Sequence, residues 1–175
     1  MGLTMTSEHE LQAIKQYKKV IEIINQYEKS KEQLLSILMD IQETAPQNCI
    51  TQTAAQIVAE ELDLPLAKIY DILTFYAMFS TVPRGQYVVE ICKSTPCHVT
   101  KADAVVKMFE EELGVKLGET TADNKFTLLH TSCVGACDIG PVAKIGEKVY
   151  GDLTREKVAE IVKCYKEGSL QCQKH

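Results

Sequence analysis

The sequence predicts an α+β fold, with an N-terminal helical bundle over residues 1–83 and an α/β domain over residues 84–175. Up to about residue 80, apolar residues recur three and four positions apart, which is the spacing of amphipathic helices. The turn-forming run Pro83-Arg84-Gly85 ends this pattern. Beyond it, segments rich in β-branched and aromatic residues alternate with helical spacing. These observations indicate two domains of different architecture.

Two helices are expected in the first half of the bundle. The first extends from Ser7 to about Glu28, and the second from Leu34 to about Thr44, because Pro46 biases the residue before it away from helical geometry. Their apolar positions are Leu11, Ile14, Tyr17, Ile21, Ile24 and Tyr27, followed by Leu34, Leu35, Ile37, Leu38 and Ile41.

Two further helices complete the bundle. The third is expected to begin at Thr51 or Thr53, since either hydroxyl can cap a helix N-terminus. The fourth includes Pro65, which suits the first turn of a helix. The apolar positions of these helices are Ala54, Ile57, Val58, Leu62, Leu66, Ile69, Tyr70, Leu73, Phe75 and Tyr76.

The second domain is predicted to follow the order strand, helix, strand, strand, strand, helix. Its strands are expected at 87–92, 126–130, 141–145 and 148–150. A helix from about Thr100 to Leu113 ends at Gly114, and a last helix opens with Thr154 as its N-cap. Gly146 offers a hairpin turn between the last two strands. This order indicates a compact α/β sandwich.

The composition excludes several protein classes. The chain has 175 residues and no apolar run of about 18 residues, so we expect no direct membrane insertion. Its net charge of -5 disfavours a nucleic-acid partner, because binding phosphates requires cations. No secretory or Arg-rich targeting pattern begins the sequence, and we expect a bacterial cytoplasmic protein. In that compartment its 7 Cys stay reduced, which favours metal-binding or catalytic thiols over disulfides.

Four of the cysteines form two closely spaced pairs. Cys92 and Cys97 enclose four residues, and Cys133 and Cys137 enclose three. Both pairs follow predicted strands, and a loop that leaves the end of a strand can direct two thiolates at one point. Two such loops at the same end of a sheet can close a four-sulfur site. We therefore expect these four cysteines to bind a metal group.

Zinc, a 2Fe-2S cluster and buried thiols are the possible interpretations of this site. Tetrahedral sets of soft thiolates hold either zinc or an iron–sulfur cluster. Structural zinc usually takes a two-residue loop on at least one side, whereas Lys93-Ser94-Thr95-Pro96 is longer. Gly135 and Ala136 allow backbone N–H groups to approach sulfur, which favours the cluster. If the four cysteines served only as small buried hydrophobic side chains, their occurrence as two pairs in two loops would have no explanation.

The cysteine pattern resembles that of a known family. Its Cys-x4-Cys and Cys-x3-Cys pairs are spaced as in the thioredoxin-like 2Fe-2S ferredoxins, and the chain resembles the small subunit of NADH dehydrogenase complexes. The segments 74–79, 117–121 and 133–137 are similar to further signatures of that family. One departure is Asp138-Ile139-Gly140 before Pro141, where relatives more often have a small apolar residue next to the proline. This difference concerns the surroundings of the cluster and leaves the ligands intact.

The resemblance implies a thioredoxin-like α/β domain that holds one 2Fe-2S cluster through Cys92, Cys97, Cys133 and Cys137. It also implies a one-electron carrier within a multi-subunit complex that oxidises NADH or reduces NAD. The parent complex is expected to be an NAD-linked or electron-bifurcating hydrogenase, a formate dehydrogenase or an NADH:quinone oxidoreductase (complex I). FMN and NAD(H) are expected only on a partner, a flavin- and iron–sulfur-containing NADH dehydrogenase subunit, to which the helical domain docks. The chain itself is expected to contain no catalytic residue.

Other functions are weighed against electron transfer. A zinc-stabilised assembly module uses the same four thiols without redox activity. A thiol–disulfide enzyme favours Cys-x-x-Cys at a helix start, and neither pair has that spacing. The helix, break and helix between Thr53 and Met78 superficially resemble a DNA-reading helix-turn-helix, but the second helix has Lys68 as its one cation.

Several residues outside the ligand set have predicted roles. Phe75, Tyr76, Met78 and Phe79 are expected either to dock a partner or to fill the seam between the domains. Cys164 is expected to fill the core, and no ligand role is expected for Cys49, Cys164 or Cys172. The cations closest in sequence to the ligands, which are candidates for tuning the cluster, are Lys93, His98, Lys101 and Lys144.

Overall fold

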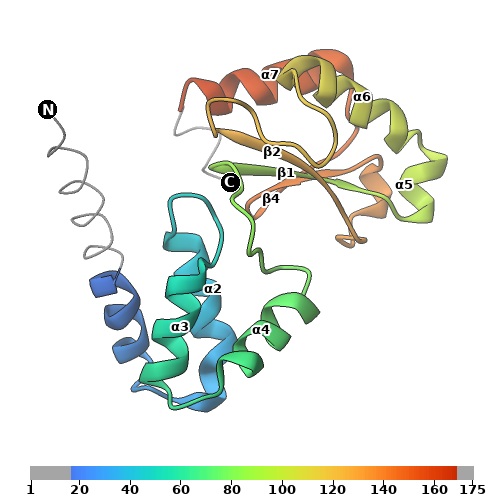
Figure 1. Cartoon of the computed structure of the whole chain (residues 1–175). Helices are drawn as coiled ribbons and strands as arrows, with labels where there is room; N and C mark the ends of the chain where they lie inside the picture. The colour runs from blue at the N-terminus through green and yellow to red at the C-terminus, as the bar shows by residue number, and fades with distance from the viewer. Residues whose placement is uncertain (1–16, 169–175) are drawn as a thin grey trace, which may run out of the picture. The chain divides into compact units, whose positions relative to one another are not determined.

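The computed structural model describes residues 17–168. The chain divides into two compact units, with the boundary between Pro83 and Arg84. Helices form the first unit, and a four-stranded sheet with helices forms the second (Figure 1). The predicted α+β fold class is therefore confirmed. The part of the predicted first helix that precedes residue 17 lies outside the described residues.

The first unit is built from short helices around one apolar core. Residues 17–26 are helical, and they are followed by the 3-10 turn η1 (Lys31–Gln33), α2 (Leu34–Thr44), α3 (Gln52–Glu61) and α4 (Leu66–Phe75). The apolar stripe of each α-helix faces the others, as the spacing of the sequence predicts. The fully buried centre of this core consists of Ile24, Ile37, Leu38, Ala55, Val58 and Ile69.

The helix ends follow from local sequence chemistry. Helix α2 stops at Thr44 because Ala45, which precedes Pro46, is extended, with ψ of 137°. The hydroxyl of Thr51, one of the two candidates, accepts a hydrogen bond of 3.2 Å from the backbone N–H of Ala54 and so caps α3. Pro65 stands at the N-cap of α4, one position before its first turn.

The second unit contains a mixed sheet with strand order β2-β1-β3-β4. Its strands are β1 (Tyr87–Cys92), β2 (Phe126–Thr131), β3 (Ala143–Ile145) and β4 (Lys148–Tyr150). Strands β1 and β2 run parallel, whereas β3 pairs antiparallel with both β1 and β4. Helices α6 (Ala102–Leu113) and α7 (Arg155–Lys166) cover one face of the sheet (Figure 1).

The core of this unit lies between that sheet face and the two helices. Alternate strand residues point into it, including Val89 and Ile91 of β1 and Leu128 of β2. Phe109 of α6 and Val162 of α7 meet them from the helical side. The sheet and the helices therefore share one core, and the loops at the strand ends extend from it.

One helix was missing from the sequence-based assignment. The predicted helix from about Thr100 to Leu113 corresponds to α6, and the missed helix is the short α5 (Thr95–Val99) before it; Lys101 between the two is left-handed, with φ of 69°. Strand β3 begins at Ala143 and not at Pro141. The last helix opens as predicted, since the Thr154 hydroxyl accepts from the backbone N–H of Lys157. Among residues 17–168, no helix has the length and apolarity needed to cross a membrane.

Candidate metal centre

The parallel pairing of β1 and β2 brings the two cysteine loops to the same end of the sheet. Cys92, the last residue of β1, lies opposite Thr131, the last residue of β2. The backbone N–H of Lys93 extends this pairing with a hydrogen bond of 3.1 Å to the Thr131 carbonyl. Cys133 follows two residues later, so both loops leave the sheet side by side. Cys92 itself is the last residue of the strand, as the predicted range 87–92 has it.

The first pair, Cys92 and Cys97, is buried. Each residue is 1% exposed, and Cys97 lies on the short helix α5, which begins after Ser94. Their thiols are hydrogen-bonded to each other. Ala102 and Val142 complete this small cluster of buried residues. The first pair of sulfurs is thus fixed by a helix and a strand end.

The second pair, Cys133 and Cys137, is exposed. The two Sγ atoms are 3.6 Å apart. Two thiolates on one tetrahedral metal, at about 2.3 Å each, lie about 3.8 Å from one another, so this separation fits a pair of ligands on one metal. Gly135 between them is left-handed, with φ of 87°, which turns the loop back on itself. Cys137 then opens the 3-10 turn η2 (Cys137–Ile139).

The two pairs lie close enough to affect one another electrostatically. A negative charge on Cys133 raises the pKa of Cys97, and charges on Cys97 and Cys92 raise the pKa of Cys137. A Cβ atom placed on Gly140, in the loop after Cys137, would lie 3.6 Å from the Cys97 Sγ. The structure therefore brings together all four predicted ligands.

Backbone groups around the buried pair favour a thiolate. Burial acts to raise the pKa of Cys92, but hydrogen bonds from the Ser94 backbone, the Cys97 thiol, the Ser94 hydroxyl and the Val134 backbone outweigh it and lower this pKa. Burial, followed by the hydrogen bond with Cys92, raises the pKa of Cys97 against a backbone hydrogen bond from Val142. The hydrogen bond with Cys133 is the main cause that raises the pKa of Cys137.

These donors include residues that the sequence did not identify. Val134 is next to Gly135, where backbone donors were expected, and Ser94 stands before the helix-favouring Thr95-Pro96, a signal that could have been recognised as an N-cap. Val142 gave no local signal, because the backbone approaches the site only through the pairing of β3 with β1. The Cys92 N–H donates a hydrogen bond of 3.0 Å to the Val142 carbonyl, which fixes this approach.

The donor set fits a two-metal group. Among residues 17–168, no group of three or more His, Cys, Asp or Glu side chains is arranged to hold one metal ion. The four thiols lie instead as two pairs, one buried and one exposed. A 2Fe-2S cluster requires two protein ligands on each of its irons, and thiolates are its usual ligands. Two thiol pairs surrounded by backbone donors meet that requirement.

The predicted tuning cations differ in their surroundings. His98 Nδ1 lies 3.4 Å from a carboxylate oxygen of Asp103, with both side chains largely exposed. Lys144 is half-buried on β3 and lies opposite Glu90 of β1 in the antiparallel register. Lys93 and Lys101 are exposed.

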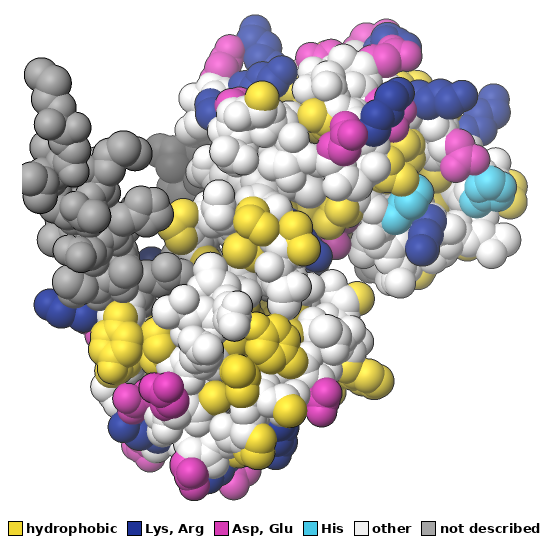
Figure 2. Space-filling model, viewed as in Figure 1, with side chains coloured by type: hydrophobic (Ala, Val, Ile, Leu, Met, Phe, Trp, Pro, Cys, Tyr) yellow, Lys and Arg dark blue, Asp and Glu magenta, His cyan; other side chains and the backbone are white. Residues whose placement is uncertain are grey.

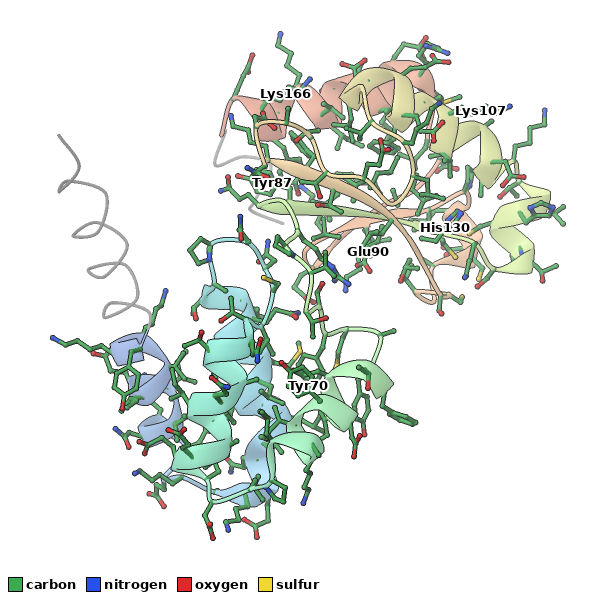
Figure 3. The ribbon with its side chains drawn as sticks, viewed as in Figure 1. Tyr70, Tyr87, Glu90, Lys107, His130 and Lys166 are labelled. Atoms are coloured by element: carbon green, nitrogen blue, oxygen red, sulfur yellow. The ribbon has the colours of Figure 1, made fainter. Side chains whose placement is uncertain are left out.

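Glu90 and His130 lie on β1 and β2, in the strand pair whose ends bear the ligand loops (Figure 3).

The other three cysteines are Cys49, Cys164 and Cys172, none of which belongs to the ligand loops. Cys49 is buried in the helical unit, in the segment before α3. Cys164 on α7 is half-buried and takes part in a disulfide, so the expectations that it fills the core as a thiol and that all the cysteines stay reduced are wrong. Cys172 lies outside the described residues.

Comparisons with known proteins match this geometry. Residues 20–166 match the family model of the thioredoxin-like [2Fe-2S] ferredoxins. The chain is 32% identical over 165 residues to the NADP-reducing hydrogenase subunit HndA of Solidesulfovibrio fructosivorans, which covers 94% of this chain and 95% of that protein. It is 38% identical over 128 residues to a subunit of the NADH-quinone oxidoreductase of Rickettsia felis, which covers 73% of this chain and 77% of that protein.

A solved structure supports the fold. The crystal structure of NAD+-reducing [NiFe]-hydrogenase in the air-oxidized state has a TM-score of 0.69 and 19% sequence identity over 78% of this chain. The chain spans 23% of the length of that hydrogenase chain. Together with the family match over most of its length, and as the resemblance of the cysteine pattern implies, the chain belongs to the thioredoxin-like [2Fe-2S] ferredoxin family.

Proposed function

We propose that this chain is the one-electron-transfer subunit of a multi-subunit complex and holds one 2Fe-2S cluster on Cys92, Cys97, Cys133 and Cys137. The observation that carries the proposal is the meeting of a buried and an exposed thiol pair at one end of the parallel strands β1 and β2. The bound cluster supplies storage for a single electron. The role of an electron-transfer subunit in an oxidoreductase agrees with the names of the relatives.

The protein groups around the site are suited to this role. Reduction adds a negative charge, and the backbone donors at Ser94, Val134 and Val142 offset charge on the buried sulfurs. The exposed pair, Cys133 and Cys137, places the other side of the site at the protein surface. An electron can therefore enter or leave through the exposed side without movement of the buried ligands.

The same proposal assigns the nicotinamide chemistry to a partner. The sequence lacks a Gly-rich nucleotide loop between a strand and a helix, and the relatives are named as subunits of NADP-reducing and NADH-oxidising complexes. We expect FMN and NAD(H) on a flavin- and iron–sulfur-containing NADH dehydrogenase subunit. The parent complex is a hydrogenase, a formate dehydrogenase or an NADH:quinone oxidoreductase.

The helical unit offers a surface for that partner. Phe75 at the end of α4 is 80% exposed, and Tyr76, Met78 and Val82 after it are also exposed apolar side chains. We call these four residues the α4 apolar patch; Figure 2 shows apolar side chains at the surface of the helical unit. Phe79, predicted to belong with them, is buried in the helical core. Exposed aromatic and Met side chains are enriched at protein interfaces, so the patch is the proposed docking surface.

The test is the metal content of the full-length chain purified without oxygen, together with its binding to the companion subunit. The proposal expects iron and acid-labile sulfide in equal amounts, the visible absorption of a 2Fe-2S cluster, and no NADH-dependent dye reduction by the chain alone. Zinc with no visible absorption would instead support the structural assembly module. Affinity purification from the native cell, with the partners identified by mass, distinguishes the candidate complexes.

A further inference from the structure

We propose that Gly151 is a positioning residue for the Cys137 ligand: it lets the loop after β4 pack against Ile139 and so fixes the turn that places the Cys137 sulfur. This inference rests on the proposed function, because it concerns how the chain holds one of the proposed cluster ligands. Gly151 lies 14 positions after Cys137 and outside both cysteine loops.

In the turn that carries Cys137, the partly buried Ile139 packs against the apolar cluster around Cys92 and Cys97. Cys137 is exposed, and η2 contains no buried residue. Its closing hydrogen bond, from the Gly140 N–H to the Cys137 carbonyl, is long, at 3.4 Å. The position of the turn therefore depends on the segments that it touches.

The loop after β4 supplies one of those contacts. The backbone N–H of Asp152 donates a hydrogen bond of 2.7 Å to the carbonyl of Ile139, the last residue of η2. A Cβ atom on Gly151 would lie 2.5 Å from both the Cβ and the Cγ1 of Ile139, and closer still to its carbonyl oxygen. Any side chain at position 151 must consequently displace Ile139 or the loop itself.

The loop after β4 is held in place more firmly than the turn η2. Gly151 is buried, and its carbonyl accepts a hydrogen bond of 2.6 Å from Lys157 Nζ on α7. Leu153, two positions further along the loop, packs in the core between the sheet and the helices. Since this loop is tied to both α7 and the sheet, a clash at position 151 is expected to move the turn.

A displacement of the turn η2 would affect both the Cys137 thiol, which the turn carries, and the buried Cys97 thiol, against which it lies. Ile139 is two residues from Cys137, and the following Gly140 lies against the buried pair, with its ideal Cβ 3.6 Å from Cys97 Sγ and 3.4 Å from the Cys137 carbonyl. The turn η2 is thus confined between the loop after β4 and the buried sulfurs. Residues that orient a metal ligand in this way control how tightly, and in what geometry, the metal group is held.

The test compares Gly151→Ala with Gly85→Ala in the full chain, with the cluster reconstituted anaerobically. Gly85 is a matched control: its added Cβ would lie 2.7 Å from the Phe126 backbone, an equally severe clash, but at the start of β1 and β2, whose other ends bear the ligand loops. Gly151→Ala is expected to lose its cluster to a chelator about tenfold faster or more. Its reduced cluster should also show altered EPR g values and a shifted reduction potential, whereas Gly85→Ala should keep those of the wild type.

Equal cluster lifetimes and unchanged spectra in the two variants would overturn the inference. If Gly151→Ala does not fold, Lys157→Met loosens the loop without a clash: faster cluster loss supports the inference, and a wild-type lifetime overturns it. Cys137→Ser separates this inference from the proposed function. If that variant keeps a wild-type cluster, the ligand assignment itself is wrong; if it loses the cluster while the loop variants do not, the positioning role alone fails.

Discussion

The Oε1 atom of Gln42 on α2 accepts a hydrogen bond of 2.7 Å from the backbone N–H of Ser80. Its Nε2 donates a second hydrogen bond, of 2.9 Å, to the Met78 carbonyl. Gln42 is buried, and it therefore holds the backbone on both sides of Phe79 against the helical core. The exposed side chains of the α4 apolar patch are presented by a segment that the core fixes in place.

Gln42→Leu is expected to lower the free energy of unfolding of the helical unit by about 2 kcal/mol or more, because the buried N–H of Ser80 and the partly buried carbonyl of Met78 lose their partners. Chemical denaturation measures this change. Gln56→Leu, on the exposed side of α3, is the control and should stay within about 0.5 kcal/mol of the wild type. Equal stability of the two variants would contradict the role of Gln42.

The α4 apolar patch is expected to bind the companion subunit. Phe75→Ser should weaken that complex by about 2 kcal/mol, a roughly thirtyfold rise in Kd, because exposed aromatic side chains are frequent hot spots. The cluster spectrum should not change. Leu35→Ser, which replaces an exposed apolar residue on α2, is the matched control. If both variants bind the partner as tightly as the wild type, the patch is not the docking surface.

Alkylation of the cluster-free chain should distinguish the two thiol pairs. Cys133 and Cys137 are exposed and should react first, while Cys92 and Cys97 are 1% exposed and should react slowly. Hydrogen bonds lower the pKa of Cys92, which favours its reactive thiolate, but access to the reagent limits its reaction. Mass spectrometry of digested protein gives the order. Reconstitution with iron and sulfide should protect the exposed pair, and undiminished labelling would be evidence against their ligation.

The ionisation of Glu110, near the end of α6, makes the stability of the fold depend on pH. A hydrogen bond of 3.0 Å from the Leu117 backbone N–H is the main cause that lowers its pKa below the usual 4.5. A carboxyl with a lowered folded-state pKa stabilises the fold above its unfolded pKa, and that stabilisation is lost as the pH falls through the folded pKa. Glu110→Gln should therefore be less stable than the wild type at neutral pH, and the difference should shrink below pH 4.5. Thermal melts over this range measure it; a difference that does not depend on pH would contradict this linkage.

Much of the fold was predictable because local chemistry fixes it. Strand β1 and the end of α2 lie where residue type and Pro46 indicate, and Thr154 caps α7 as predicted. Helix α5 was missed because it has only 5 residues and includes Pro96, so it shows no helical periodicity.

The ligand spacing was visible in the sequence, but the supports of the ligands were not. Val142 reaches Cys97 through the pairing of β3 with β1, and Gly151 reaches Ile139 from a distant loop. Such contacts depend on how remote segments meet, and a lone valine or glycine gives no local signal of it. The left-handed Lys101, which separates α5 from α6, is likewise an uncommon choice that residue type does not indicate.

The central claim is that two pairs of cysteines hold one 2Fe-2S cluster, and EPR spectroscopy of single Cys→Ser variants tests it most directly. The reduced full-length chain should give the spectrum of one such cluster. Serine at Cys92, Cys97, Cys133 or Cys137 should change or abolish that spectrum, because a hard oxygen replaces a soft thiolate. Cys49→Ser, the control in the helical unit, should leave it unchanged. A wild-type spectrum in Cys133→Ser, together with its loss in Cys49→Ser or Cys172→Ser, would contradict this account.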